Sequence, residues 1–186
     1  MENQNKVVAV MKGTITRCAK ELVESRFGED KWQAILEDAD VDQDTRYRLS
    51  YPTTDIDDSV AKDVLVSTGR VLGLSPEQVA EAFGEHWCCE YAPKIYSSII
   101  TRFNSAREMI LGMDKVHVQM TATIKNARPP RFDYDWQDDN TLIVTYKSFR
   151  GMIDIYRGLV MGVGKLFNEP VQARKVDNAR VEIIFG

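Results

Sequence analysis

The chain has 186 residues, of which 44% are hydrophobic, enough to bury a sizeable core as one domain or as two closely packed lobes. Its formal net charge is −4, and acidic and basic residues are interleaved, so it lacks the basic stripe of a nucleic-acid-binding protein. The first residues lack a long apolar run, and no later stretch approaches the roughly 20 apolar residues that span a bilayer. These features predict a cytoplasmic protein that binds neither nucleic acid nor membrane.

The three cysteines predict neither a disulfide framework nor a structural zinc site. Cys18, Cys88 and Cys89 are an odd number and form no spaced CxxC pair. Cys88 and Cys89 are poor disulfide partners because consecutive Cα atoms lie about 3.8 Å apart. We expect reduced thiols that pack as small apolar side chains on a helix, while a redox role for the adjacent pair stays open.

The first part of the chain is predicted to be helical. Apolar residues at Ile15, Ala19, Leu22 and Val23 have the spacing of an amphipathic helix over 15–27, which Gly28 would end. Further helices are predicted over 31–38, over 60–72 and, after the capping residue Ser75, over 76–90. The segment 43–58 is rich in Asp, Thr and Tyr and is predicted to be a loop. The first lobe, about 11–75, is therefore predicted to be all-helical.

The second part of the chain predicts a mixture of helices and strands. One helix is expected from about Tyr96 into Leu111, and a further helix carries Met113, Val116, His117, Met120 and Ile124 before Pro129 and Pro130 end it. Alternating residues predict a hairpin of 132–136 and 141–146, then a helix over 152–167 and short strands near 173–175 and 181–185. The predicted fold class is α+β: a helical N-terminal lobe packed on a C-terminal lobe of helices and an antiparallel sheet, about 76–186.

The segment 146–150 has the composition of an anion-binding site. If it is a β-strand, its alternate residues Tyr146, Ser148 and Arg150 project from one face. They offer three hydrogen-bond donors, one of them a charged fork that suits a pair of carboxylates or a phosphate. The alternative is an ordinary half-exposed strand end.

A single histidine, His117, lies in an apolar helical pattern upstream of the double proline. In an arbitrary domain such a histidine is more often a core or surface residue, but a histidine ligand together with an anion clamp points to haem. The other histidine, His86, follows an acidic residue and precedes Trp87, so we expect it on a helix surface, as a fallback ligand only.

Several segments together resemble the haem-nitric oxide/oxygen binding (H-NOX) family, which is related to the haem domain of soluble guanylate cyclase and to bacterial nitric oxide sensors. The segments are Met11 to Ile15, Ala82 to Trp87, Asp114 to His117, the double proline, the Tyr-x-Ser-x-Arg signature and Gly158 to Gly162. The resemblance implies that 1–186 is a single H-NOX domain with haem b between its lobes. Residues 1–10 precede the usual family start and are expected to be an extension, either a disordered lead-in or a partner contact.

The resemblance assigns roles to individual residues. His117 would ligate the iron, and Tyr146, Ser148 and Arg150 would hold the haem propionates. Pro130 would press on the porphyrin from the proximal side and Ile15 would pack on the opposite side, which favours a non-planar haem. A simple helix stop and a core isoleucine are the alternative interpretation of these last two residues.

The residues expected on the distal side of the haem predict which gas is bound. In the oxygen-binding branch of the family a tyrosine donates a hydrogen bond to oxygen, whereas the matching residue here, five positions after Arg150, is Ile155. The resemblance therefore implies a sensor of nitric oxide, and of carbon monoxide, that excludes oxygen. An oxygen-binding form using Tyr156 or Trp87 as donor is the alternative. Leu159, with Cys88 and Tyr91, would complete the distal wall.

The implied mechanism is binding of nitric oxide to ferrous haem, breakage of the bond to His117, and a rearrangement of haem and lobes that a partner detects. In the family that partner is a histidine kinase, a cyclic-dinucleotide enzyme, a chemotaxis receptor or a cyclase. The chain itself is expected not to be an enzyme and to be either a stand-alone sensor or one domain of a larger protein. Less favoured alternatives are a peroxidase-type haem enzyme, a catalyst using Cys88 or Cys89, and a scaffold that has lost haem.

Overall fold

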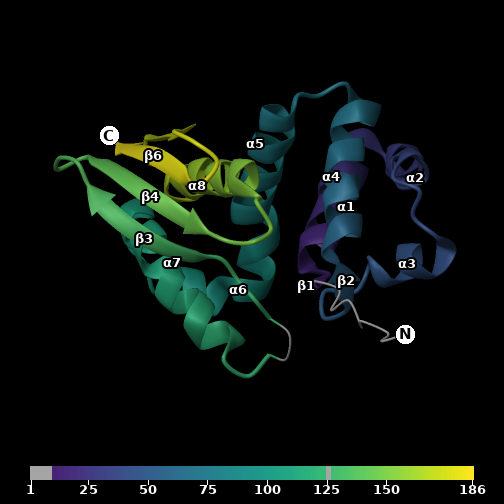
Figure 1. Ribbon diagram of the computed structural model, residues 1–186, viewed down its shortest axis with the longest axis horizontal. Helices are drawn as coiled ribbons and strands as arrows, with labels where there is room; N and C mark the ends of the chain where they lie inside the picture. Colours follow the sequence, from purple (N-terminus) through teal and green to yellow (C-terminus); the bar gives the residue numbers. More distant parts are fainter. Residues whose placement is uncertain (1–9, 125–126) are drawn as a thin grey trace, which may run out of the picture. The chain divides into compact units, whose positions relative to one another are not determined.

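A computed structural model describes residues 10–124 and 127–186 and divides into two compact units, with the boundary between Leu72 and Gly73 (Figure 1). Of the expected extension 1–10, Val10 begins a strand and the other nine residues lie outside the described residues.

The first unit consists of four helices and a two-stranded sheet among its described residues. In chain order these are β1 (Val10–Lys12), α1 (Thr14–Phe27), α2 (Glu29–Asp38), α3 (Gln43–Arg48), β2 (Asp55–Asp57) and α4 (Asp58–Leu72). The three helices predicted for this part are confirmed as α1, α2 and α4. Their apolar sides form the core of the unit, which includes Leu22, Val23, Trp32, Ile35, Leu36 and Val64.

The prediction that 43–58 is a loop, and with it that the first lobe is all-helical, is wrong. The side chain of Asp42 accepts a hydrogen bond from the backbone N–H of Thr45 at 3.0 Å, which caps α3. Further along, Ile56 is 1% exposed and pairs with Met11, so that β2 runs antiparallel to β1. A three-residue strand is too short to show an alternating apolar pattern in the sequence. It forms only through pairing with a segment more than forty residues away.

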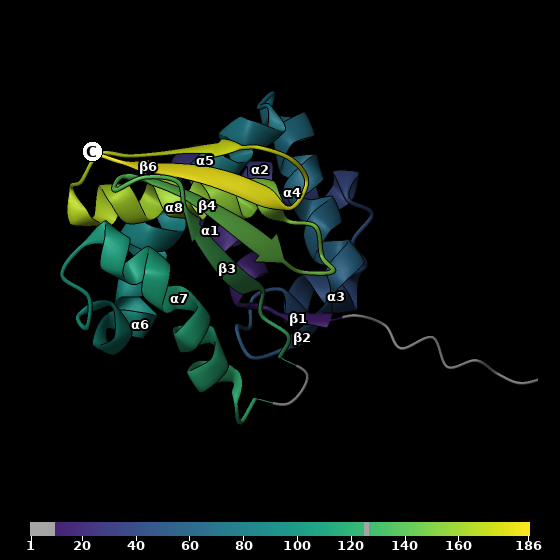
Figure 2. The ribbon, with the colours of Figure 1, turned by 60° about the vertical axis from the view of Figure 1, so that its left-hand side comes forward.

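The second unit combines helices with a four-stranded antiparallel sheet, which confirms the predicted mixed fold. Its elements are α5 (Pro76–His86), the π-helix η1 (Trp87–Tyr91), α6 (Ala92–Ile100), α7 (Ala106–Thr121), β3 (Arg131–Trp136), β4 (Thr141–Lys147), α8 (Ile153–Phe167), β5 (Val171–Lys175) and β6 (Arg180–Phe185). The strand order is β3-β4-β6-β5, and α8 covers one face of the sheet (Figure 2).

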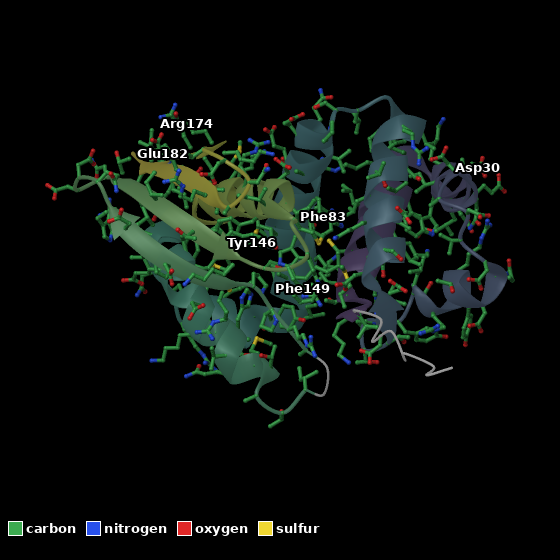
Figure 3. All side chains as sticks on the ribbon, viewed as in Figure 1. Asp30, Phe83, Tyr146, Phe149, Arg174 and Glu182 are labelled. Atoms are coloured by element: carbon green, nitrogen blue, oxygen red, sulfur yellow. The ribbon has the colours of Figure 1, made fainter. Side chains whose placement is uncertain are left out.

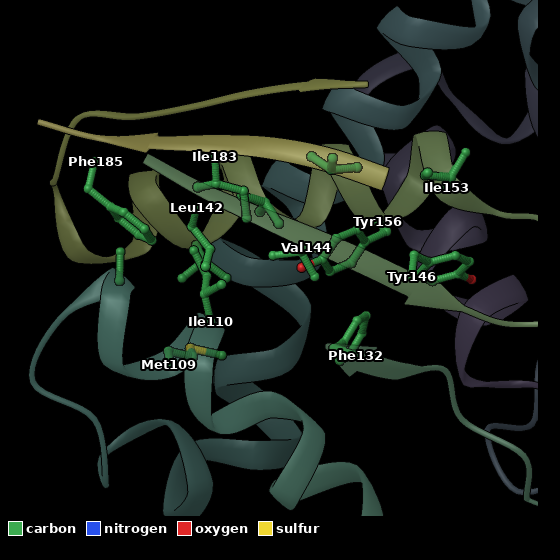
Figure 4. Packing of buried hydrophobic residues seen from close by; sticks show 14 of the residues in the cluster. Met109, Ile110, Phe132, Leu142, Val144, Tyr146, Ile153, Tyr156, Ile183 and Phe185 are labelled. Carbon is green, nitrogen blue, oxygen red and sulfur yellow. The ribbon is translucent and has the colours of Figure 1, made fainter. Parts of the chain in front are cut away.

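The core of the second unit lies between this sheet face and helices α7 and α8. Buried residues alternate along the two central strands, as expected for a sheet with one covered face: Leu142, Val144 and Tyr146 in β4, and Val181, Ile183 and Phe185 in β6. Figure 4 shows Met109, Ile110 and Leu142 at one end of this core and the rings of Phe132, Tyr146 and Tyr156 at the other.

Three helix boundaries differ from the predictions. The prediction of a single helix from Tyr96 into Leu111 is wrong, because α6 ends at Ile100 and α7 begins after Ser105. The hydroxyl of Ser105 accepts a hydrogen bond from the N–H of Glu108 at 3.1 Å and so caps α7. The helix expected to continue to residue 90 changes to a π-helix at Trp87. The helix carrying His117 ends at Thr121, before Ile124.

Helices α5 and α8 approach each other with their backbones in direct contact. A Cβ atom added to Gly158 would lie 2.0 Å from the carbonyl oxygen of Ala80, and one added to Gly84 would lie 2.0 Å from the carbonyl oxygen of Gly158. A Cβ on Gly162 would meet the Gly84 carbonyl oxygen at 2.2 Å. Only glycine fits at these crossings, so the glycines of the Gly158 to Gly162 segment set the distance between the two helices.

We predict that Gly158→Ala destabilises the protein by about 1 to 3 kcal/mol, because the methyl group would overlap the Ala80 backbone and force the helices apart. Alanine's better helix propensity, worth about 1 kcal/mol, would act in the opposite direction. Urea unfolding measures the change. The control is Ser98→Ala at an exposed position of α6, which should be nearly neutral; stabilisation by Gly158→Ala would contradict the close-contact interpretation.

Candidate functional site

His117 lies on α7 in a geometry that suits a metal ligand. Its Nδ1 is 3.2 Å from the carbonyl oxygen of Pro130, and its ring is 5.7 Å from the ring of Phe132. Because a carbonyl oxygen can only accept, Nδ1 carries the proton and Nε2 keeps the lone pair that binds metals. Burial lowers the pKa of His117 below its ordinary value, so the imidazole is neutral at physiological pH.

An ion pair next to His117 fixes α7 to the start of β3. Arg131 donates from Nε and Nη2 to the two carboxylate oxygens of Asp114, each at 2.7 Å, and Asp114 also accepts from the N–H of Phe132 at 3.0 Å. The hydrogen bonds from Arg131 are the main reason that the pKa of Asp114 falls to about 2. Asp114 precedes His117 by almost one helical turn, so the pair holds the part of α7 that carries the histidine.

The expected clamp residues occupy a strand end and the turn that follows it. Tyr146 is in β4, but the strand ends at Lys147, so the prediction that all three clamp residues alternate along one strand is wrong for Ser148 and Arg150. Residues 148–152 connect the strand to α8, and within this connection Gly151 takes a left-handed conformation (φ +64°). Figure 3 shows Tyr146 and Phe149 on this stretch.

The three side chains nevertheless lie together at this turn. Ser148 Oγ accepts from the backbone N–H of Arg150 at 3.3 Å. Burial raises the pKa of Tyr146, against smaller opposing effects of a hydrogen bond with Ser148 and of the positive charge of Arg150. The Arg150 guanidinium lies 4.7 Å from the centre of the Phe149 ring.

Arg150 also links the turn to the segment that leads into Pro130. Its Nη1 donates to the carbonyl oxygen of Arg128, two residues before the carbonyl that accepts from His117. The two parts of the candidate site, the histidine and the clamp, therefore both bind the backbone of the 127–130 segment. Neither this link nor the Asp114–Arg131 pair was predicted from the sequence. The Asp-x-x-His spacing on a predicted helix places Asp114 near His117 but does not indicate Arg131.

The residues expected on the distal side lie where η1 packs on α8. Trp87 lies between the rings of Phe83 and Tyr91, at centroid distances of 5.9 and 5.3 Å. Cys88 Sγ donates to the carbonyl oxygen of Leu159 at 3.5 Å. Ile155 precedes Leu159 by four residues in α8, so both lie on one side of that helix. A π-helix is often found at functional sites, which fits this arrangement.

Tyr156 lies on the sheet side of α8, within the aromatic end of the core. Its ring stacks on Phe132 at 4.8 Å and on Tyr146 at 5.5 Å. Phe132 in turn is the ring beside His117. Tyr156 is thus part of the packing around the histidine and the clamp.

Ile15 and His86 lie in different units, and Cys88 lies close to His86 in the sequence. Ile15 lies half-buried on α1 in the first unit, and its role against a haem stays a prediction. The expectation that His86 lies on a helix surface is wrong: it is only 5% exposed, because it lies at the junction of α5 and η1. None of the three cysteines is in a disulfide, and burial raises the pKa of Cys88, so it is a poor nucleophile.

The donor set of this site fits a haem. A neutral imidazole with a hydrogen-bonded Nδ1 suits an axial iron ligand, and a guanidinium, a hydroxyl and a phenol suit propionate carboxylates. Among residues 10–124 and 127–186 no group of three or more His, Cys, Asp or Glu side chains could hold a metal ion. In the same ranges, every helix is too short or too polar to span a membrane.

Comparisons with known proteins agree with the resemblance seen in the sequence. The sequence profile of the family described as Haem-NO-binding matches residues 12–175. The soluble guanylate cyclase gcy-34 of Caenorhabditis elegans is 27% identical over 161 residues, which are 84% of this chain and 23% of that protein. The chain thus spans about a quarter of the length of the guanylate cyclases that it matches.

Two solved structures show the same fold. An unliganded Fe(II) H-NOX protein from K. algicida is 21% identical, with a TM-score of 0.78 over 95% of this chain and 96% of that chain. An H-NOX protein from S. oneidensis in the Fe(II)NO ligation state is 18% identical, with a TM-score of 0.80 over 94% of this chain and 98% of that chain.

We predict that Asp114→Asn lowers the free energy of unfolding by about 1 to 2 kcal/mol at neutral pH, a range that allows for screening of the half-exposed Arg131. The native pKa of Asp114, about 2, lies below its ordinary value of 3.8, so its stabilising effect is present above pH 3.8. It is lost as the pH falls through about 2.

Urea unfolding of both proteins between neutral pH and pH 2 tests this prediction. The difference in unfolding free energy should shrink over the acid end of the range. Asp133→Asn, which removes a more exposed partner of Lys147 in the neighbouring strand, is the control and should cost less than Asp114→Asn. A difference that does not depend on pH would contradict the assigned ion pair.

Proposed function

The chain belongs to the Haem-NO-binding (H-NOX) family, and we propose that it is a sensor that binds nitric oxide and carbon monoxide at a ferrous haem b and excludes oxygen. The observation that carries the proposal is the contact of 3.2 Å between His117 Nδ1 and the Pro130 carbonyl oxygen. It fixes the tautomer and the orientation of the only histidine that shares the motif with the double proline.

Different residues of the chain would bind different parts of the cofactor. His117 would donate Nε2 to the iron, while Tyr146, Ser148 and Arg150 would bind the propionates. Pro130 would press on the porphyrin from the proximal side, and contact of Ile15, in the first unit, with the porphyrin stays a prediction from the sequence. When bound, the haem supplies an iron atom with one coordination position for a gas.

Two features support the exclusion of oxygen. The residue that matches the oxygen-binding tyrosine of the family is Ile155, which has no hydrogen-bond donor in its side chain. Tyr156, the nearest alternative, is stacked on Phe132 and Tyr146 and is only 8% exposed. Burial also raises the pKa of Tyr156, consistent with a ring packed in the core. Trp87 is the remaining candidate donor, and oxygen binding through its indole N–H is the second candidate function.

A peroxidase-type enzyme is less compatible with these residues. Such an enzyme requires a general acid or base on the distal side, and Ile155, Leu159 and Trp87 provide none. The thiols are also poor candidates for catalysis, since burial raises the pKa of both Cys88 and Cys89.

We expect the signal to leave the site through α7. Release of His117 from the iron on nitric oxide binding would change the constraint on a helix that the Asp114–Arg131 pair ties to β3. A partner responds only if it binds the two states with different affinity. The partner is proposed to be a histidine kinase, a cyclic-dinucleotide enzyme, a chemotaxis receptor or a cyclase, in the cytoplasm, acting as a separate protein or as further domains of the same protein.

Absorption spectra of the haem-loaded, reduced protein under anaerobic conditions test the gas preference. We expect oxygen to leave the ferrous spectrum unchanged and nitric oxide to give the spectrum of five-coordinate iron without His117. His117→Gly should lose the proximal ligand of the iron and regain one with added imidazole. His86→Gln should keep its proximal ligand and show the spectrum of the unchanged protein. A stable complex with oxygen would instead favour Trp87 as a donor, and a protein that cannot hold haem would refute the proposal.

We predict that Arg150→Lys weakens haem retention by about tenfold or more, since lysine cannot form the two-pronged hydrogen bond with a carboxylate. The rate of haem transfer to an apoprotein that scavenges haem measures this. Arg128→Lys is the control, because it keeps the charge and the backbone carbonyl that Arg150 contacts. Equal haem loss from both variants would show that Arg150 does not bind a propionate.

A further inference from the structure

Phe149 is the most exposed large apolar residue of the second unit among the residues that the structure describes, at 60% exposed, and it lies inside the candidate clamp. Single apolar residues are common on protein surfaces, so exposure alone assigns no role. What distinguishes Phe149 is its neighbour, because the guanidinium of Arg150 lies over its ring, 4.7 Å from the ring centre. A cation at this distance is attracted by the negative face of an aromatic ring.

This contact depends on the place where β4 ends. Side chains of consecutive residues in a strand point to opposite faces, so a strand that continued through Phe149 and Arg150 would separate the ring from the guanidinium. The strand instead stops at Lys147, and residues 148–152 connect it to α8, with Gly151 in a left-handed conformation. In this connection the two adjacent side chains lie together.

Two different contacts hold the guanidinium of Arg150. Its Nη1 donates to the carbonyl oxygen of Arg128, and its charge is attracted to the Phe149 ring. Arg128 precedes Pro129, which restricts the backbone of Arg128 and with it the direction of this carbonyl. The attraction to the ring acts on the charge, so it does not compete with an oxygen acceptor for the N–H groups. The ring therefore orients the guanidinium without occupying the groups that bind a carboxylate.

We propose that Phe149 is a positioning residue for the haem propionates, because it holds Arg150 in the orientation in which Arg150 binds a carboxylate. The inference rests on the proposed function. A long side chain that becomes fixed only when a ligand binds loses rotamer freedom at that moment, and this loss weakens binding. Contacts within the chain that already fix Arg150 reduce the loss. Phe149 has no hydrogen-bonding group in its side chain, so it would act through Arg150.

The experiment measures the rate of haem transfer from the haem-loaded full chain to an apoprotein that scavenges haem. We expect Phe149→Ala to raise this rate by about twofold to fivefold, the size of a cation–π contact at a partly exposed site. Phe149→Trp should keep the original rate or lower it, because indole is the ring that attracts cations most strongly. Phe149→Leu should behave like Phe149→Ala. If leucine instead kept the original rate, apolar bulk would be sufficient and the proposal would be overturned.

A second background tests whether Phe149 acts through Arg150. In Arg150→Gln, which replaces the guanidinium with an uncharged amide, Phe149→Ala should have no further effect on the rate of haem transfer. An equal increase in both backgrounds would overturn the proposal, because the ring would then act independently of Arg150. Phe27→Ala makes the same change at a 43% exposed residue of the first unit and is the matched control, which should leave the rate unchanged.

The unsubstituted protein separates this inference from the proposed function. Its absorption spectrum shows whether the chain holds haem before any variant is compared. A chain that holds no haem would refute the proposed function and this inference with it. A chain that holds haem, and loses it no faster after Phe149→Ala, would overturn this inference alone and leave the proposed function in place.

Discussion

The hydrogen bond between His117 and the Pro130 carbonyl requires several independent parts of the second unit to be in place. Helix α7 supplies the imidazole, and the segment before β3 supplies the acceptor. The Asp114–Arg131 pair holds the helix against the strand, and Arg150 holds the same segment from the turn after β4. Residues 127–130 lie outside both α7 and β3, so the Pro130 carbonyl takes no part in helix or strand pairing and can accept from the histidine.

Helix α8 packs closely against its neighbours on two sides. On one side its glycines allow backbone contact with α5, and on the other Tyr156 fills the space between Phe132 and Tyr146. Packing on both sides therefore fixes α8, and with it Tyr156 against the Phe132 ring that lies beside His117.

Most of the helices and strands followed from local sequence patterns. The periodicity over 15–27, 60–72 and 152–167 predicted α1, α4 and α8, and the alternation around 137–140 predicted the β3–β4 hairpin. Two of the failures come from contacts that leave no periodic signal: strand β2 exists because β1 pairs with it, and His86 is buried because its helix packs on neighbours. The break between α6 and α7 is different, because it depends on the local cap at Ser105, which the Ser-x-x-Glu spacing to Glu108 could have indicated.

The sequence by itself determined the fold class and the residue types of the candidate site, because a histidine, a double proline and a Tyr-x-Ser-x-Arg motif at this spacing are specific to one family. Only the tertiary structure decided how these residues are held. The acceptor for His117 is a backbone carbonyl, the partner of Asp114 lies seventeen residues away, and Ser148 and Arg150 lie in the turn that follows the strand. Backbone groups are the same in every residue, so their roles emerge only when the chain brings distant segments together.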